Sequence, residues 1–353
     1  MDPILVTGGA GFIGSCVVRR LVESGKQVVT LDALSYAGHV ESLEAALNAP
    51  NHRFVQADIR DRRSLRRTLA LARPQAVIHL AAESHVDRSI DSPMDFVTTN
   101  VEGTVTLLEA VTEYWGQLEG VARQRFRFLH VSTDEVYGSL GSDGVFTETT
   151  PYRPNSPYAA SKAASDHFTR AWHRTFGLPV MISHCSNNYG PYQMPEKLIP
   201  VVILAALEGR PIPVYGDGRN VRDWLFVDDH ARALELIVEG GLPGNVYNVG
   251  ADSEIANIDL VRTICSRMDE QVPESPHRPH ADLIEFVADR PGHDRRYAID
   301  SSSVRYELGW RPSVDLQEGL DLTVRWYLEN RWWWQGVRDG GFEDRRRQGL
   351  GIG

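Results

Sequence analysis

A glycine pattern near the start of the chain constrains the fold more than any other feature. The apolar run 3–7 leads directly into TGGAGFIG (7–14), and a helical pattern follows it. Glycines at positions 8, 11 and 14 allow a tight turn and close packing, and a helix N-terminus there offers N–H groups to a pyrophosphate. An ordinary glycine-rich turn is the alternative. The strand before the glycines and the helix after them favour a dinucleotide site instead.

The N-terminal half of the chain alternates short apolar runs with helical patterns such as 11–24 and 99–114. The predicted strands are residues 3–7, 27–32, 53–58, 76–81, 126–132 and 180–184. Near-continuous Val, Ile and Leu in such strands is typical of a buried parallel sheet built from βαβ units. The pattern predicts an α/β fold, a doubly wound parallel-sheet Rossmann domain with a smaller α/β substrate lobe.

The regular alternation of strand and helix patterns fades after residue 187, where prolines become frequent. We place the NAD-binding domain at residues 1–190 and the second lobe at 191–353. Two later strand-like segments, 224–227 and 245–249, could return to the first sheet, so we expect 223–250 to rejoin it. The end of the chain, 336–353, is rich in Gly and Arg and is expected to be a mobile tail.

Composition excludes several classes of partner. The net charge of −10 argues against nucleic-acid binding and against an anionic membrane surface. The longest apolar run, 198–207, is too short to span a bilayer, and no secretory signal is visible. The three cysteines are widely spaced and the twelve histidines show no metal-ligand spacing. We therefore expect no disulfide framework, no metal and a cytoplasmic location.

Two acidic strand ends point to the cofactor. Asp32 ends the second predicted strand, 18 residues after Gly14. A carboxylate there can accept hydrogen bonds from both ribose hydroxyls of NAD and would repel the 2′-phosphate of NADP. Asp58 and Ile59 end the third strand, where they would meet the adenine; a strand-end cap is the alternative for this pair.

A second motif, SPYAASK (156–162), carries candidate catalytic residues. Ser156 suits a helix N-cap and Pro157 the first helical position, so Tyr158 and Lys162 would share one helix face. The Lys162 ammonium and a positively charged nicotinamide would lower the pKa of the Tyr158 phenol and let it take a proton from a sugar hydroxyl. A solvated aromatic–charge pair is the alternative. The chain has only three lysines among 37 Lys and Arg residues, which favours a specific role for Lys162.

Together these motifs resemble the extended short-chain dehydrogenase/reductase superfamily and, more narrowly, the dTDP-glucose 4,6-dehydratases. The matching stretches are TGGAGFIGS (7–15), HLAAESHVDRSI (79–90), VSTDEVYG (131–138), NSPYAASKAASD (155–166), NNYGPYQMPEKLIP (187–200), RDWLFVDDHARAL (222–234) and DRPGHDRRYAID (289–300). The resemblance implies a dTDP-glucose 4,6-dehydratase that uses tightly bound NAD, and a homodimer formed through 99–114 and the helix that carries Tyr158.

The resemblance also implies the catalytic residues Thr133, Asp134, Glu135, Tyr158 and Lys162. Tyr158, aided by Thr133, removes the 4-hydroxyl proton as hydride passes from carbon 4 to NAD. Glu135 then takes the proton on carbon 5, while protonated Asp134 assists departure of the 6-hydroxyl, and hydride returns to carbon 6. Simple epimerases of the superfamily lack the Asp-Glu pair, and a dehydration needs its two further proton transfers. A polar strand end is the alternative interpretation of this stretch.

The family pattern assigns further contacts. Cofactor contacts are expected from Gly8, Gly11, Phe12, Ile13, Gly14, Asp32, Ala33, Leu34, Ser35, Asp58, Ile59, Leu80, Ala81, Ala82, Ser84, Thr99, Tyr158, Lys162 and Asn188. Substrate contacts are expected from Ser84, Thr133, Asn187, Lys197, Leu198, Ile199, Pro200, Val201, Pro213, Val214, Tyr215, Arg222, Asn257, Asp289, Arg290, Pro291, Gly292 and His293. Arg222 would grip the diphosphate, and Leu198, Val214 and Tyr215 would hold the pyrimidine. Some of these residues could instead only pack or cap.

Two alternative functions stay open at this point. One is another nucleotide-sugar dehydratase or a 4-epimerase, and the other is an inactive NAD-sensing or scaffold protein on the same fold. The pyrimidine contacts suit thymine and uracil alike, and the product could serve cell-envelope or natural-product sugars.

Overall fold

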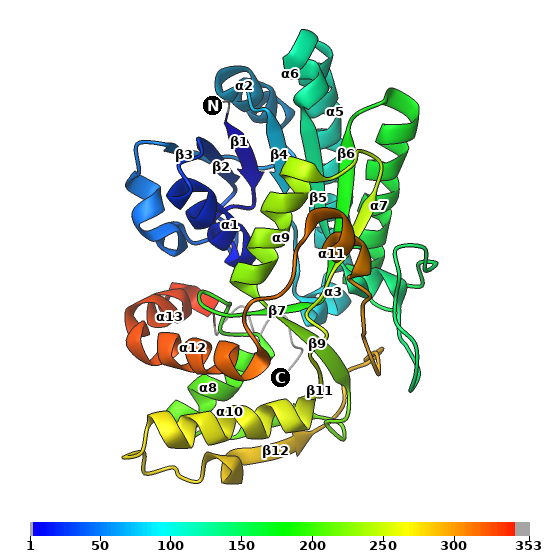
Figure 1. Ribbon diagram of the computed structural model, residues 1–353. Helices are drawn as coiled ribbons and strands as arrows, with labels where there is room; N and C mark the ends of the chain where they lie inside the picture. Colours follow the sequence, from blue (N-terminus) through cyan, green and yellow to red (C-terminus); the bar gives the residue numbers. More distant parts are fainter. Residues whose placement is uncertain (1–2, 343–353) are drawn as a thin grey trace.

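The computed structural model describes residues 3–342 and is built around one seven-stranded parallel sheet (Figure 1). Its strand order is β10-β6-β5-β4-β1-β2-β3. The strands are β1 (Ile4–Thr7), β2 (Val28–Asp32), β3 (His52–Gln56), β4 (Ala76–His79), β5 (Arg127–Thr133), β6 (Val180–Cys185) and β10 (Val246–Val249). Every neighbouring pair is parallel. The predicted doubly wound α/β fold is confirmed.

Helices cover both faces of this sheet because its side chains alternate between them. Ile4 and Val6 of β1 pack into the cluster that includes the helices α1 (Phe12–Glu23) and α9 (Val227–Gly240). Leu5, between them, packs into the opposite cluster. The helices that border this second face are α2 (Arg62–Ala72), α5 (Thr104–Gly116) and α7 (Pro157–Phe176). Both faces are therefore buried, as the apolar strands require.

Shorter elements connect these layers. They are α3 (Val86–Asp91), α4 (Pro93–Phe96), α6 (Gly120–Arg125), α11 (Ser302–Leu308), the 3₁₀ segments η1 (Val40–Asn48), η3 (Asp134–Tyr137) and η4 (His280–Leu283), and the π-helical segments η2 (Val97–Gly103) and η5 (Arg338–Phe342). The predicted helix at 99–114 is thus a π-helical segment that continues into α5. Within residues 3–342, no helix is both long and apolar enough to cross a membrane.

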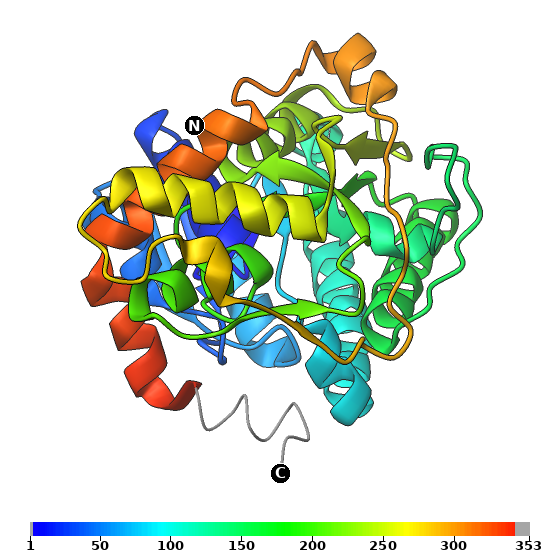
Figure 2. The ribbon, with the colours of Figure 1, turned by 90° about the horizontal axis from the view of Figure 1, so that it is seen from below.

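A second lobe lies against the ends of the large sheet and has its own core. Its strands are β7 (Asn187–Tyr189), β9 (Val221–Phe226) and β11 (Glu254–Ala256) in one small sheet, and β8 (Ile212–Tyr215) with β12 (Ile284–Val287) in another. Its helices are α8 (Leu198–Glu208), α10 (Asn257–Gln271), α12 (Leu316–Glu329) and α13 (Arg331–Val337). Figure 2 shows α10 along the outer side of this lobe, and one apolar cluster joins all four helices.

The structure corrects the predicted return of 223–250 to the first sheet. β10 does join it beside β6, and α9 packs on it. β9 does not, because it pairs with β7 and β11 in the small sheet. The chain therefore enters the small sheet in β9 and leaves it directly through α9. The domain division at residue 190 stays a prediction.

The predicted mobile tail is wrong for residues 336–342. These residues complete α13 and η5. The reason is the aromatic run just before them: Trp333 and Trp334 are buried in the core of the second lobe, and Val337 is buried beside them. Trp333 also donates a hydrogen bond of 3.1 Å to Ser42 Oγ, which ties α13 to η1. Residues 343–353 lie outside the described part of the chain.

Candidate active site

A cavity of about 490 Å³ lies where the carboxyl ends of the large sheet's strands meet the second lobe. This is the edge at which doubly wound sheets bind ligands. Thr133 at the end of β5 and Asp32 at the end of β2 line it from one side, and α8 and β8 line it from the other. The volume suits a small-molecule site.

The glycine loop between β1 and α1 forms one wall of this cavity. Gly8 has φ +71°, and a Cβ on it would lie 2.6 Å from Ala81 N. A Cβ on Gly14 would lie 2.0 Å from Gly8 O. Only glycine fits these two positions, so the backbone can approach a ligand closely just where α1 begins. The loop thus fits the pyrophosphate of a dinucleotide, as predicted.

Asp32 is ordered by two backbone hydrogen bonds. Its carboxylate accepts from Ala10 N at 2.9 Å and from Leu34 N at 2.8 Å. Burial raises the pKa of Asp32, and these bonds oppose the rise. Asp32, Ala33 and Ser35 line the cavity, whereas Leu34 does not. Leu34 is therefore a correction to the predicted cofactor contacts, because it acts through its N–H on Asp32. Every other residue predicted to contact the cofactor lines the cavity.

Helix α7 presents Tyr158 and Lys162 to the cavity. Ser156 caps this helix by accepting a hydrogen bond of 3.1 Å from Ala159 N, and Pro157 occupies its first turn, as the sequence indicated. Lys162 is 5% exposed, and its Nζ donates to Val131 O at 2.9 Å. The spacing of four residues therefore does bring the phenol and the ammonium to one site.

The predicted lowering of the Tyr158 pKa depends on the Lys162 ammonium and the nicotinamide together, and the surrounding protein opposes it. Burial raises the pKa of its phenol well above the ordinary value, Glu135 and Cys185 add to the rise, and the hydrogen bond with Thr133 opposes it. Burial also lowers the pKa of Lys162. Desolvation is therefore the strongest influence on the pKa of each group in the protein by itself.

The Thr133-Asp134-Glu135 stretch sits at the end of β5, where the chain turns into η3. Thr133 Oγ1 accepts a hydrogen bond of 3.3 Å from Glu135 N and lies 3.4 Å from Asp134 Oδ1. Thr133 and Glu135 line the cavity. Asp134 is 2% exposed, does not line the cavity and contacts Thr133, which does.

The two adjacent carboxyl groups have different surroundings. Burial raises the pKa of Asp134 well above its usual range, and the Glu135 charge raises it further. Burial also raises the pKa of Glu135, but Arg290, Arg222 and Lys197 oppose that rise. The surroundings therefore favour the protonated form of Asp134, and three cations favour the anion of Glu135, a difference that suits acid and base roles.

Cationic side chains from the second lobe face the same space. Arg222 is 5% exposed, donates to Asp294 O at 2.8 Å and lies over the Tyr297 ring at 4.2 Å. Lys197 donates to Ser84 O at 3.1 Å, and Arg290 lies 3.5 Å from Asp87. These three cations form a site that suits a diphosphate.

Most of the predicted substrate contacts line the cavity. They are Ser84, Thr133, Asn187, Lys197, Leu198, Val201, Pro213, Val214, Tyr215, Arg222, Asn257, Arg290 and His293. Five do not. Ile199 and Pro200 are buried in the core around α8, since that helix turns them away from the cavity. Asp289, Pro291 and Gly292 are exposed beside it, and Asp289 holds His293 through a contact of 2.7 Å.

Sequence reasoning missed several residues that line the cavity. These include Tyr36, Gly38, Arg60, Glu83, His85, Asp87, Ser186, Gln193, Met194, Glu196, Trp224 and Tyr297. His85 and Glu196 lie in two of the motif stretches and meet across the cavity, with Nε2 and Oε2 3.5 Å apart. Their place within those motifs was the available signal. In the described residues, no group of three His, Cys, Asp or Glu side chains is placed to hold a metal.

Comparisons with known proteins agree with this geometry. Residues 5–323 match the family model described as GDP-mannose 4,6 dehydratase. The dTDP-glucose 4,6-dehydratase of Neisseria meningitidis is 55% identical over all of both chains, and that of Escherichia coli is 51% identical over 97% of this chain and 98% of its own.

Solved structures give the same fold. The Streptomyces venezuelae dTDP-glucose 4,6-dehydratase with NAD and TYD bound has a TM-score of 0.86 and 46% identity, covering 95% of this chain and 99% of its own. The Thermotoga maritima UDP-glucose 4-epimerase has a TM-score of 0.81 and 32% identity, covering 93% and 99%. The fold alone therefore accommodates two chemistries, and the side chains in the cavity must separate them.

Proposed function

This chain belongs to the dTDP-glucose 4,6-dehydratases, within the family of the GDP-mannose 4,6 dehydratase model, and on that premise we propose that it converts dTDP-glucose to dTDP-4-keto-6-deoxyglucose with loss of water and with tightly bound NAD. It is an NAD-dependent hydro-lyase of the extended short-chain dehydrogenase/reductase type.

One observation carries this conclusion. A single cavity joins the glycine loop, the Tyr158–Lys162 pair and Glu135, with Asp134 in contact with Thr133 of its lining. A 4-epimerase needs the first two features, because it only moves a hydride away from one carbon and back to it. The two carboxyl groups with separated environments supply the further acid and base that a dehydration requires.

The chain's own groups divide the proton transfers. Bound NAD supplies the hydride acceptor for carbon 4 and the donor for carbon 6. Tyr158 removes the 4-hydroxyl proton, with Thr133 in hydrogen-bond contact with its phenol and Lys162 on the same helix face. Glu135 removes the carbon 5 proton, which the neighbouring ketone acidifies, and carbon 5 regains a proton when hydride adds to carbon 6. Asp134, protonated because it is buried, is the acid for the 6-hydroxyl, and Thr133 links it to the cavity.

The second lobe binds the nucleotide. Arg222, Lys197 and Arg290 face the position of the diphosphate, and the guanidinium of Arg222 is held in place by backbone carbonyls. Val214 and Tyr215 of β8 also line the cavity, and they would hold the pyrimidine.

The test is the product formed from dTDP-glucose. Mass spectrometry should show a nucleotide sugar lighter by one water, formed faster than from UDP-glucose or GDP-mannose. A product of unchanged mass would indicate a 4-epimerase, and no turnover with any of the three would indicate an inactive NAD-binding protein. Faster dehydration of UDP-glucose or GDP-mannose would identify another dehydratase.

We also propose a homodimer through α5 and α7, in the cytoplasm. Exposed apolar side chains on or next to these helices support it, among them Phe168 and Phe176 on α7 and Met94 and Val97 just before α5. The three cysteines are free and buried, which is compatible with a reducing compartment. Light scattering of wild type and a Phe168→Glu variant tests the dimer, since the charge should shift the mass toward that of one chain.

A further inference from the structure

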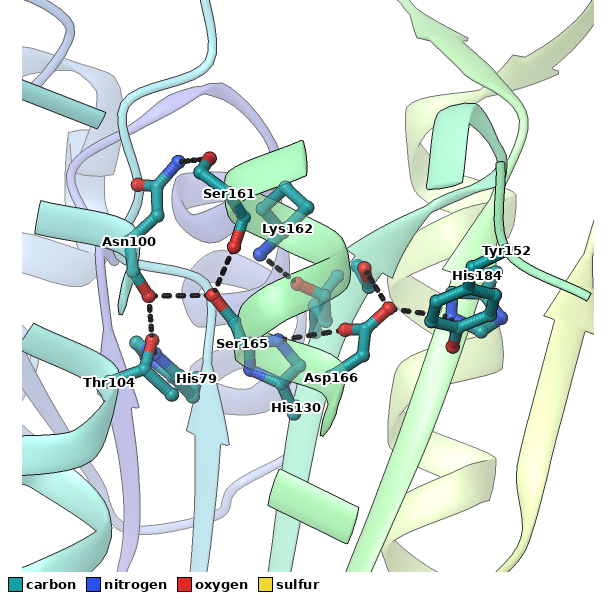
Figure 3. Close-up of polar contacts among 12 residues, drawn as sticks. His79, Asn100, Thr104, His130, Tyr152, Ser161, Lys162, Ser165, Asp166 and His184 are labelled. Carbon is teal, nitrogen blue, oxygen red and sulfur yellow. Dashed lines mark hydrogen bonds and ion pairs between the residues drawn. The ribbon is translucent and has the colours of Figure 1, made fainter. Parts of the chain in front are cut away.

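A buried polar network lies beside the catalytic lysine (Figure 3). At its centre is Asp166, one helical turn after Lys162 on α7 and 1% exposed. Asp166 does not line the cavity, in contrast to Lys162. An ionised carboxylate so deep in the protein needs compensating partners.

Asp166 connects α7 to the two central strands. Its Oδ2 accepts a hydrogen bond of 2.9 Å from Ser132 Oγ and lies 3.0 Å from His184 Nε2. Its Oδ1 lies 3.2 Å from His130 Nε2. Ser132 directly precedes Thr133, and Val131, which accepts the Lys162 hydrogen bond, lies on the same strand. One carboxylate therefore joins both elements that carry catalytic groups.

The titratable groups around Asp166 come from three elements. Lys162 and, further along, Arg170 lie on its own helix, His130 comes from β5 and His184 comes from β6. Tyr137 and Tyr152 contact the two ring nitrogens of His184 at 2.7 and 2.9 Å. His79 of β4 lies beyond His130, with ring centroids 5.2 Å apart.

These groups respond differently to burial. Burial lowers the pKa of His130 to about 4, so this ring is neutral at neutral pH. Burial would raise the pKa of Asp166, but the bonds to His130 and His184 hold it below its usual range. Burial lowers the pKa of Lys162, and the Asp166 charge is the strongest influence that raises it. Asp166 is thus ionised and lies one helical turn from the buried Lys162 ammonium.

We propose that Asp166 is a positioning residue whose carboxylate keeps Lys162 charged and in place beneath Tyr158. The proposal rests on the catalytic role of that pair given above. Without the carboxylate, a buried ammonium with one backbone carbonyl as its recorded hydrogen-bond acceptor would release its proton more readily. A neutral lysine would no longer stabilise the Tyr158 phenolate, and the first hydride transfer would slow.

The primary test is Asp166→Asn, which keeps the shape and removes the charge. The readout is the single-turnover rate of NADH formation from dTDP-glucose, measured across pH. We expect the rate of NADH formation to fall by roughly tenfold or more at pH 8. We also expect the alkaline limb of the pH–rate profile to move to lower pH by about one unit or more. The matched control is Ser165→Ala, which removes a buried hydrogen-bonding group beside Asp166 without altering charge. The alkaline limb of the Ser165→Ala pH–rate profile should lie at the same pH as that of the wild type.

The proposal would be overturned by an Asp166→Asn enzyme that is only slower, with both limbs of its pH–rate profile at the wild-type pH values. Asp166→Glu retains the charge and should retain the wild-type limb position even if packing lowers the rate. Failure of the proposed function would look different, because wild-type enzyme itself would then form no dehydrated product.

A double-mutant cycle of thermal stability tests the proposal even if the Asp166→Asn variant folds poorly. In Lys162→Met the buried charge is absent, so the double variant Lys162→Met/Asp166→Asn should melt at a higher temperature than Asp166→Asn alone. If Asp166→Asn does not accumulate, recovery of folded double variant supports the proposal. Additive losses, or a double variant that also fails to accumulate, would contradict it.

Discussion

Replacing Glu135 by Gln should separate the two halves of the proposed reaction. The side chain lines the cavity at the start of η3, and its backbone N–H bonds to Thr133 Oγ1 at 3.3 Å. Glutamine preserves its volume and that backbone bond but cannot accept the carbon 5 proton. Tyr158 acts earlier, on a different proton, so oxidation at carbon 4 should continue.

The expected magnitude follows from the surroundings of the carboxylate. Loss of a general base slows its step by roughly 10²–10⁴-fold, or about 3–5 kcal/mol on the barrier. Ground-state binding should hold, because Arg222 and Arg290 lose a neighbouring anion and remain free to bind the diphosphate. Burial raises the pKa of Glu135, so wild-type proton removal should rise with pH through a value above the ordinary 4.5. In the Glu135→Gln variant, the rate of carbon 5 proton removal should not show this rise with pH.

The assay is rapid-mixing absorbance of NADH with quenched-flow mass spectrometry of the sugar. Bound NADH and a 4-keto-glucose nucleotide should accumulate in Glu135→Gln, whereas Tyr158→Phe should accumulate neither. Two results would refute the reasoning. Dehydration at the wild-type rate would mean that Glu135 is not the base. Absence of NADH, in a variant that still binds substrate and NAD, would mean that Glu135 is needed before carbon 5 is reached.

Four further variants test the remaining assignments. Asp32→Ala should narrow the preference for NAD over NADP in binding to apo-enzyme, and equal affinities in wild type would refute the role of this carboxylate. Lys162→Arg should lose at least roughly tenfold in turnover, about 1.4 kcal/mol, because a planar guanidinium does not fit where a buried ammonium meets Val131 O; turnover within about twofold would contradict this. Gly14→Ala should reduce the NAD content of purified protein at least roughly tenfold, since the alanine Cβ would overlap the Gly8 backbone oxygen. Full occupancy by NAD would show that the loop can adjust its backbone to hold the alanine. Trp333→Phe should lower the free energy of unfolding by about 1–3 kcal/mol in chemical denaturation, and no change would mean that this indole does not secure the C-terminal helix.

The sequence by itself determined the features that depend on short stretches of chain. The end of a strand, a glycine turn and the first turn of a helix all lie within a dozen residues. The motif TGGAGFIG was therefore enough to predict the local backbone geometry. Tyr158 and Lys162 share a helix face because their spacing is four residues and Ser156 caps the helix before them. Six strands of the large sheet were found to within a few residues, since their apolar runs mark burial on both faces.

The tertiary structure decided what depends on partners distant in sequence. β9 and β10 look alike as apolar runs, but only pairing with β7 or β6 assigns each to its sheet. Residues 336–342 contain three glycines and two charged residues, yet Trp333 just before them and Val337 within them pack on the lobe core.

The electrostatics of the site also come from the tertiary structure. Asp134 and Glu135 are adjacent in sequence, and burial together with cations from the second lobe gives them different proton affinities. Asp166 shows no function in sequence beyond its place at the end of a motif. It acquires one because folding buries it between Lys162 and histidines of two strands, where low polarity makes each charge depend on its neighbours.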